Sequence, residues 1–337
     1  MRSLAVAVPV HDPTGAIGDP ELPTLALALH PDAAEAQLAR VPSLAAAGAG
    51  PLVRIAVLRH KPGRRCLIAY ELERYGTVLG KIQRRRYGKS GFRLLAALRV
   101  AGLDGEGDGI AVPEPLGSIG AFRMWLQREA PGRRATEKID AGDDDGRLAR
   151  RIAEAAHKLH RAGVPAERRH GVGDELRILD ACLERVAAVE PRLAPRLQRL
   201  SRRCARAPEH LAGAPSSGIH RDFYADQVLV DGNRLTLVDF DLYCEGDPAL
   251  DIGNFLGHVA EQALRMRGDA NAFRGFENEL EARFGELAGA DACARVPVWT
   301  ALTVARHVYL STRFEERRAL TERLVNVAEE RLAEAGL

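Results

Sequence analysis

Asp222, Gln227 and Asp239 stand in the stretch of the chain that is richest in acids and turn residues, 218–255. Gln227 opens an apolar run at 227–230, and Asp239 lies in the next run, 236–240. The Asp-Gly-Asn segment between the two runs is typical of a β-hairpin turn. The loop before the first strand of a hairpin and the end of its second strand lie at the same edge. We therefore expect the three side chains to converge.

Those residue types suit a magnesium site beside a base. Carboxylate and amide oxygens are ligands that Mg²⁺ prefers, so Gln227 and Asp239 are candidate metal ligands. Asp222 would then accept a proton from a substrate hydroxyl, a division of labour known from phosphoryl transfer. The alternative is that each residue is an ordinary turn residue, since Asp is common in turns. The combination and spacing favour the catalytic interpretation.

The first half of the chain is expected to be rich in β-strands. Residues 52–72 read as two strands around a Lys-Pro-Gly turn, and residues 77–82 and 121–127 as further strands. A helix is expected at 91–99 and a polar Gly/Asp loop at 105–109. We predict an N-terminal lobe at 1–130, in which residues 1–50 form an extension.

From residue 141 onward the apolar pattern becomes helical. Leu148, Ile152, Ala155 and Leu159 recur on one helical face, and later helices are expected at 249–266, 271–287 and 295–335. The predicted fold class is α+β, with a small β-rich lobe followed by a larger helical lobe, residues 131–337, that contains the hairpin. The Pro-Gly pair at 131–132 is the predicted boundary.

Composition limits the classes of partner. The 48 basic and 46 acidic residues leave a formal net charge of +2, which argues against a nucleic-acid or membrane-surface protein held by bulk charge. The five cysteines form no CxxC pair, so reduced thiols and a cytoplasmic location are expected. No apolar segment approaches the ~20 residues of a spanning helix. The sequence does not determine the oligomeric state.

The stretch around Asp222 resembles the aminoglycoside phosphotransferase and choline kinase family, small-molecule kinases with a protein-kinase-like fold. The family pattern is HxD, an Asn five residues later, an apolar strand, Asp-Phe or Asp-Trp, and GDP-x-x-D. Here His220 and Asp222 match HxD, Gln227 stands at the Asn position, Asp239 begins the Asp-Phe pair and Asp251 ends the last motif. The resemblance implies Asp222 as catalytic base, Gln227 and Asp239 as metal ligands, and His220 and Asp251 as supports of the catalytic loop.

Weaker similarity continues into the first half. Lys81, in a Gly-Lys pair, resembles the strand lysine that holds the α- and β-phosphates of ATP. Gln127, Glu129 and Ala130 lie in a segment that resembles the inter-lobe connection, which offers backbone groups to adenine. The resemblance implies ATP and Mg²⁺ as cofactors. It implies transfer of the γ-phosphate to a hydroxyl of a small molecule, which is an aminoglycoside, a sugar or polyol, or an amino alcohol.

The sequence departs from the kinase pattern in several places. Gln227 replaces Asn, the helix at 91–99 contains no Glu to pair with Lys81, and the turn at 60–65, with Arg64 and Arg65, stands where kinases have a Gly-rich loop. These differences leave open an alternative, a non-catalytic nucleotide-binding or scaffold protein on the same fold. Asp251 follows Asp239 too closely for the activation segment of a protein kinase, which excludes that class.

Overall fold

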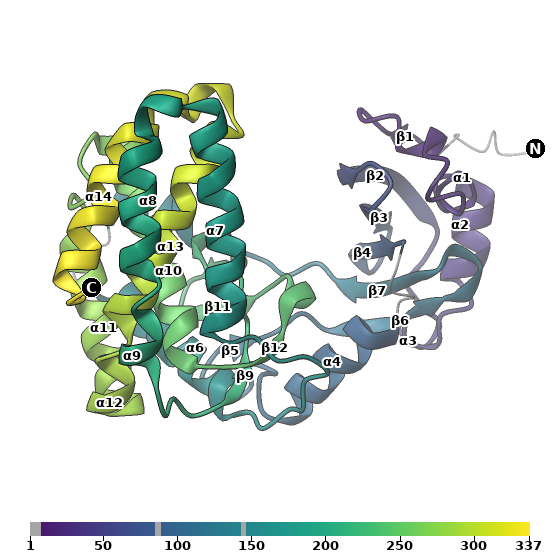
Figure 1. The fold of residues 1–337 in the computed structure, drawn as a ribbon. Helices are drawn as coiled ribbons and strands as arrows, with labels where there is room; N and C mark the ends of the chain where they lie inside the picture. The colour runs from purple at the N-terminus through teal and green to yellow at the C-terminus, as the bar shows by residue number, and fades with distance from the viewer. Residues whose placement is uncertain (1–7, 85–88, 143–145) are drawn as a thin grey trace, which may run out of the picture. The chain divides into compact units, whose positions relative to one another are not determined.

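The strand-rich and helical patterns become two separate units of the computed structural model, which describes residues 8–84, 89–142 and 146–337 (Figure 1). Unit 1 contains residues 8–104 and 111–131. Unit 2 contains residues 105–110 and 132–337. The polar Gly/Asp loop at 105–110, which lies within the predicted N-terminal lobe, is therefore part of unit 2. A β-rich part and a larger helical part with a hairpin are both present, so the predicted α+β class is confirmed.

Unit 1 is built on a six-stranded sheet of order β1-β2-β3-β4-β7-β6. The pair β1 and β2 is parallel, and the other neighbours are antiparallel. The strands predicted at 52–72 and 77–82 and the helix at 91–99 are confirmed, and the strand predicted at 121–127 begins only at Met124, after the 3-10 turn η2 (Gly120–Phe122). The elements are β1 (Val10–His11), β2 (Leu52–Lys61), β3 (Arg65–Leu72), β4 (Gly76–Gln83), β6 (Pro115–Ile119), β7 (Met124–Arg128) and α4 (Lys89–Val100).

The segment before β2 contributes to the core of unit 1. It forms α1 (Leu25–Ala28), α2 (Pro31–Leu38) and α3 (Pro42–Ala46), none of which the sequence analysis predicted. Buried residues of these helices pack with the inner face of the sheet in one apolar cluster. The Tyr70 hydroxyl donates to the carbonyl of Ala28 at 2.9 Å, so the segment is fastened to the third strand by a buried hydrogen bond.

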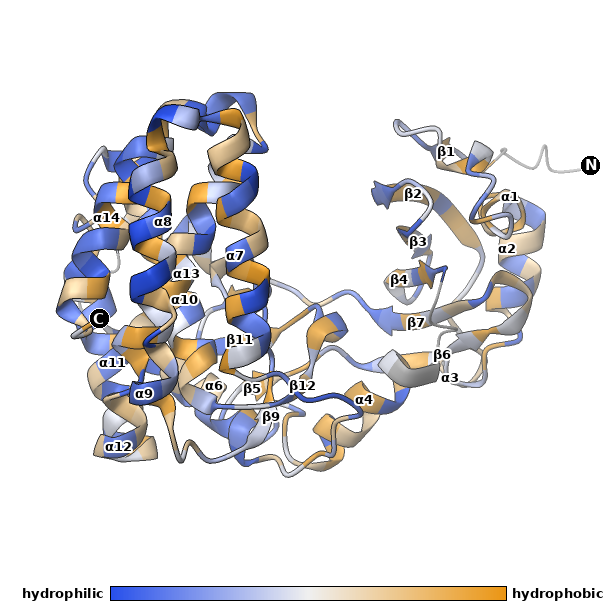
Figure 2. Ribbon diagram, in the orientation of Figure 1, coloured by the Kyte–Doolittle hydropathy of each residue, from blue (hydrophilic) through white to orange (hydrophobic). Residues whose placement is uncertain are grey.

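Unit 2 is mainly helical. Figure 2 shows hydrophilic and hydrophobic residues alternating along its helices, as expected where one face of each helix is buried. The helices are α5 (Ala135–Ala141), α6 (Arg147–Arg161), α7 (Val172–Val189), α8 (Ala194–Cys204), α9 (Ala207–Leu211), α10 (Pro248–Arg267), α11 (Arg274–Ala288), α12 (Ala290–Cys293), α13 (Val296–Thr312) and α14 (Thr321–Glu334). The backbones of α10 and α13 approach closely. A Cβ on Gly253 would lie 2.4 Å from the Cβ of Trp299.

The prediction of one helix over 295–335 is wrong. The chain forms α13 and α14, separated by the 3-10 turn η6 (Glu315–Leu320). The intervening sequence contains no Gly or Pro to signal a break, and Phe314 is extended, with φ −126°. The chain reverses direction at η6, so the apolar face of α14 packs against α13. A hydroxyl–hydroxyl hydrogen bond of 2.8 Å between Ser311 and Thr321 joins the two helices beside the turn.

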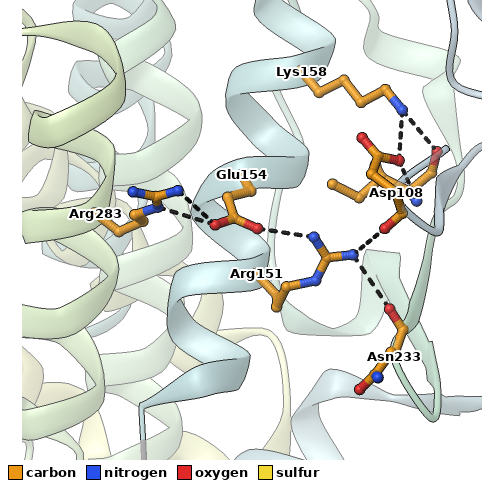
Figure 3. A network of polar contacts seen from close by, with 7 residues as sticks. Asp108, Arg151, Glu154, Lys158, Asn233 and Arg283 are labelled. Carbon is orange, nitrogen blue, oxygen red and sulfur yellow. Dashed lines mark hydrogen bonds and ion pairs between the residues drawn. The ribbon is translucent and has the colours of Figure 1, made fainter.

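The predicted hairpin is confirmed as β10 (Val228–Asp231) and β11 (Arg234–Leu237). It lies inside a sheet of order β5-β11-β10-β8, with β5 (Ile110–Ala111) at one edge. Figure 3 shows how its turn is held. Arg151 on α6 donates to the carbonyls of Asp108 and Asn233, at 2.6 and 3.3 Å, and Lys158 donates to the Asp108 carboxylate at 2.7 Å. The other edge strand, β8 (Arg133–Arg134), pairs with β10. The hairpin is therefore fixed at the end opposite Gln227 and Asp239.

None of the helices in the described part of the chain is long and apolar enough to cross a membrane.

Candidate active site

Gln227 and Asp239 meet at the open end of the hairpin. Gln227 immediately precedes β10, and its carbonyl accepts from the N–H of Val238 at 2.9 Å. Asp239 is the next residue after Val238, so the two predicted metal ligands lie at the same sheet edge. The ring of His220 donates through Nε2 to the carbonyl of Val238 at 2.8 Å. This bond holds the loop that contains Asp222 against the same edge.

A single buried carboxylate anchors that loop. Asp251, near the start of α10, is fully buried and accepts from the backbone N–H groups of His220 and Arg221, at 2.8 and 2.7 Å. Its third donor is Nε2 of His160 on α6, at 2.9 Å. Hydrogen bonds to an ionised acceptor are stronger than neutral ones, and two of these are to consecutive backbone groups. Asp251 therefore fixes the backbone immediately before Asp222.

We expect the substitution Asp251→Asn to destabilise the protein. An amide can accept from one of the two N–H groups but turns its own NH₂ toward another donor, so at least one buried donor is left unsatisfied. That costs about 1–3 kcal/mol of the free energy of unfolding. Chemical denaturation measures it. The matched control is Asp231→Asn in the exposed hairpin turn, expected within about 0.5 kcal/mol of wild type. Equal stability of the two variants would contradict the anchoring role.

The loop and the hairpin end both carry left-handed backbone at residues other than glycine. Arg221 has φ +68° and Asp239 has φ +62°. Side chains with a Cβ adopt this region at a cost of roughly 1–2 kcal/mol, and Asp tolerates it better than Arg. Such conformations persist where the surrounding contacts impose them and are common at functional sites. Here the N–H of Arg221 is held by Asp251.

A second buried network supports the loop from the helices. Asn254 on α10 donates to the carbonyl of Phe223 at 2.9 Å and accepts from Nη2 of Arg306 on α13 at 2.7 Å. Arg306 also donates to Glu175 on α7 at 2.8 Å, and His170 donates to the same carboxylate. Burial alone would raise the pKa of Glu175, but Arg306 and His170 lower it to about 2. No sequence motif marks this network.

The donors at the hairpin end suit Mg²⁺. One carboxylate, Asp239, and one amide oxygen, Gln227, are the hard oxygen ligands that this ion prefers, and it usually keeps waters and substrate phosphates in its remaining positions. No group of three or more His, Cys, Asp or Glu side chains arranged to hold a metal occurs in the described residues. A resident all-protein metal cage is therefore not seen in this part, whereas a two-ligand site fits.

In unit 1, Lys81 and Gln127 share one face of the sheet. Lys81 pairs with Trp125 and Leu79 pairs with Gln127, across β4 and β7. The flanking residues Val78 and Ile82 point to the buried core on the other face. The N-terminal helices pack with that core, so the face with Lys81 is the one that they do not cover.

Two backbone N–H groups of the predicted adenine-binding segment already donate hydrogen bonds within the protein. The N–H of Arg128 donates to the carbonyl of Glu114 at 2.9 Å, and the N–H of Glu129 donates to that of Thr77 at 3.1 Å. Glu129 would therefore contact a base only through other groups. At the opposite end of these strands, the carboxylate of Asp19 accepts from His60 and from the N–H of Gly63, both at 2.8 Å, which ties the turn between β2 and β3 to the N-terminal segment.

A family model described as "Phosphotransferase enzyme family" matches residues 87–290. Comparison with curated proteins finds no match.

Among solved structures, a choline/ethanolamine kinase family protein from Mesorhizobium loti is 20% identical, with 89% of this chain and 94% of that chain covered and a TM-score of 0.57. A glucosamine kinase is 17% identical, with 90% and 83% covered and a TM-score of 0.59. An amicoumacin kinase in complex with AMP-PNP, Ca²⁺ and Ami is 16% identical, with 82% and 88% covered and a TM-score of 0.56. The predicted kinase-like fold is confirmed.

Proposed function

The chain belongs to the phosphotransferase enzyme family, and from that membership we propose that it is an ATP- and Mg²⁺-dependent kinase that phosphorylates a hydroxyl of a small molecule. The observation that carries the proposal is the convergence at the hairpin end. Gln227 and Asp239 lie at one sheet edge, and the loop with Asp222 is tied to that edge through His220 and held by Asp251.

We assign the roles residue by residue. Lys81 would bind the α- and β-phosphates, and the backbone of Gln127, Glu129 and Ala130 would contact adenine. Gln227 and Asp239 would hold Mg²⁺, which, when bound, neutralises charge on the polyphosphate. Gln227 retains the amide oxygen of the family's Asn and places it one methylene further from the backbone, so it can still act as a ligand.

Asp222 would orient the acceptor hydroxyl and accept its proton. In the proposed step, the acceptor oxygen forms a bond to the γ-phosphorus while the bond from that phosphorus to the β-γ bridging oxygen breaks. ADP leaves, and the hydroxyl proton passes to the Asp222 carboxylate and then to solvent. Since little covalent chemistry falls to the protein, positioning dominates. The hydrogen bonds of Asp251 and Asn254 to residues on both sides of Asp222 would hold the loop so that the Asp222 carboxylate is positioned for this step.

The alternative of a non-catalytic protein rests on Gln227 and on the absence of an acid from α4. Neither of these two differences favours a non-catalytic protein specifically. The amide ligand is kept, and Asp222, Asp239 and Lys81 are all present. A cytoplasmic location, where ATP is abundant, remains part of the proposal.

The test is thermal unfolding of the wild-type protein alone, with ATP, and with ATP and Mg²⁺, followed by ADP release with a panel of alcohols. A ligand that binds only the folded state stabilises it by ~2.7 kcal/mol at a hundredfold excess over Kd. We expect the largest increase in Tm with ATP and Mg²⁺ together, and ADP release that depends on an alcohol. No increase with any nucleotide would overturn the proposal.

A further inference from the structure

The short turn between the catalytic loop and the hairpin is tied to a neighbouring helix. This turn is η4 (Ala225–Gln227), and it ends at the proposed metal ligand Gln227. The carboxylate of Asp226 accepts from the hydroxyl of Thr136 on α5 at 2.5 Å. Hydrogen bonds from a hydroxyl to a carboxylate, at about 2.5–2.7 Å, are roughly twice as strong as neutral ones. The residue before Gln227 is therefore held by a strong contact from outside the loop.

The helix that carries Thr136 is itself fixed. Gln262 on α10, only 4% exposed, donates to the carbonyl of Thr136 at 3.2 Å and to the carboxylate of Asp140 at 2.8 Å. Arg267, the last residue of α10, donates to the carbonyl of Asp140 at 2.7 Å. Since α10 also carries Asp251, one helix holds the catalytic loop directly and holds η4 through α5.

The chain that leads into α5 runs along the hairpin. Arg134 pairs with Leu229 and Arg133 with Val230, so β8 lies antiparallel to β10. Gly132, with φ +113°, permits a close approach, because a Cβ there would lie 2.7 Å from the carbonyl oxygen of Val230. In this antiparallel register the residues after Arg134 continue toward the start of β10, where η4 lies. The contact between α5 and η4 therefore extends the pairing of β8 with β10.

Gln227 has a buried side chain with an unpaired amide. The residue is 6% exposed, and within residues 8–84, 89–142 and 146–337 its side-chain amide makes no hydrogen bond. Buried polar groups are usually paired, so this amide is available to a ligand. Its backbone is fixed, since the N–H donates to the carbonyl of Tyr224 at 2.8 Å and the carbonyl accepts from Val238. The direction of the amide therefore depends on the backbone of η4 and on packing.

Mg²⁺ is sensitive to the direction of its ligands. It requires a near-ideal octahedral arrangement with ligands at about 2.0–2.1 Å, whereas Ca²⁺ accepts a flexible arrangement at about 2.3–2.6 Å. Gln227 also has one more rotatable bond than the Asn of the family pattern, so a small rotation of its backbone moves the amide oxygen further. A contact that holds η4 should therefore matter more for Mg²⁺ than for Ca²⁺.

We propose that Thr136 and Asp226 are positioning residues, whose hydrogen bond holds η4 so that the amide oxygen of Gln227 meets the geometry that Mg²⁺ requires. The inference rests on the proposed function and adds to its metal site two residues that do not touch the cation. Asp226 is not a ligand in this arrangement, because its carboxylate is engaged by Thr136.

The experiment measures the Kd of ATP by calorimetry with Mg²⁺, with Ca²⁺ and with a chelator, so it needs no acceptor. Thr136→Val keeps the size of the side chain and removes its hydroxyl. We expect the Kd with Mg²⁺ to rise about fivefold or more, the effect of one lost hydrogen bond. The Kd with Ca²⁺ or with the chelator should change less than about twofold, because neither depends on octahedral geometry.

Three further variants test whether the bond itself is responsible. Asp226→Ala removes the other partner and should have the same effect, and the double variant should be no worse than either single one, because both remove one bond. Thr136→Ser keeps the hydroxyl and should restore the wild-type Kd. Asp226→Asn keeps an acceptor oxygen and should weaken Mg²⁺-dependent binding less than Asp226→Ala.

Ser201→Ala is the matched control. Ser201 on α8 donates to the carboxylate of Asp180 on α7 at 2.7 Å, a hydroxyl–carboxylate bond between two other helices of unit 2. Its loss should leave the Kd of ATP unchanged with either cation and with the chelator. Thermal unfolding without ligand checks that each variant folds, and if Thr136→Val does not, the comparison of Asp226→Ala with Asp226→Asn decides.

An unchanged Kd with Mg²⁺ in Thr136→Val, or equal weakening with Mg²⁺, Ca²⁺ and the chelator, would overturn the positioning role. Weaker Mg²⁺-dependent binding in Asp226→Ala but not in Thr136→Val, or equal losses in Asp226→Ala and Asp226→Asn, would show that Asp226 is itself a ligand. Those results leave the kinase intact. If the wild-type protein binds ATP under none of the three conditions, the proposed function fails, and if Mg²⁺ does not strengthen ATP binding, the proposed metal site fails. The inference fails with either.

Discussion

Asp222→Asn is expected to lower kcat by about 10²–10⁴-fold, the range that a positioned proton acceptor contributes. The substitution keeps the size and shape of the side chain and replaces the proton-accepting carboxylate with a neutral amide. The neighbouring anchors act on the backbone of His220, Arg221 and Phe223 and are untouched. The loop should therefore keep its conformation. The measurement is ADP release at saturating ATP, Mg²⁺ and acceptor.

The same variant should retain its stabilisation by ATP and Mg²⁺, because Asp222 is not a proposed metal ligand. This pairing separates a catalytic defect from a folding defect. Asp231→Asn, in the exposed turn of the adjacent hairpin, serves as the matched control and should keep wild-type kcat. Wild-type turnover in Asp222→Asn would show that another group accepts the proton and would remove Asp222 from the proposed mechanism.

The hairpin and the sheet of unit 1 were predictable from the sequence because their signals are local. Alternating apolar residues and Asp-Gly-Asn or Lys-Pro-Gly turns specify strand pairs over a few positions. The convergence of Gln227 and Asp239 follows from hairpin geometry alone. The short helices before β2 carry no such signal, because each is too brief to show a periodicity, and their stability comes from packing with the sheet.

The residues that support the catalytic loop were harder to predict. Asn254 and Arg306 are ordinary members of long helices, and only the packing of α10 on α13 brings them to Phe223. His160 follows Leu159 on a helix that the sequence predicted, but its bond to Asp251 joins residues that are far apart in sequence. The left-handed conformation of Arg221 has no signal in the sequence, since it is imposed by those distant contacts.

Asp239→Asn is expected to abolish the part of the ATP-dependent stabilisation that requires Mg²⁺. Asp239 is the only carboxylate of the proposed ligand pair, and replacing it leaves two neutral amides to hold a divalent cation beside ATP. The backbone should be unaffected, because Asn adopts the left-handed region at least as readily as Asp. The loss can therefore be ascribed to the charge. The measurement is the difference in Tm between ATP with Mg²⁺ and ATP with a chelator.

Asp241→Asn provides the sharpest comparison for that experiment. Asp241 lies two residues further on, in the turn η5 (Phe240–Leu242), and its carbonyl accepts from Arg168 at 2.8 Å. The substitution keeps that carbonyl and its bond from Arg168, and we expect the variant to retain the Mg²⁺-dependent increment. If Asp241→Asn loses the increment and Asp239→Asn keeps it, the metal ligand is Asp241 and the hairpin end has been assigned to the wrong carboxylate. If both lose it, the two acids hold the cation together, and a site with two carboxylates replaces the single-carboxylate site proposed above.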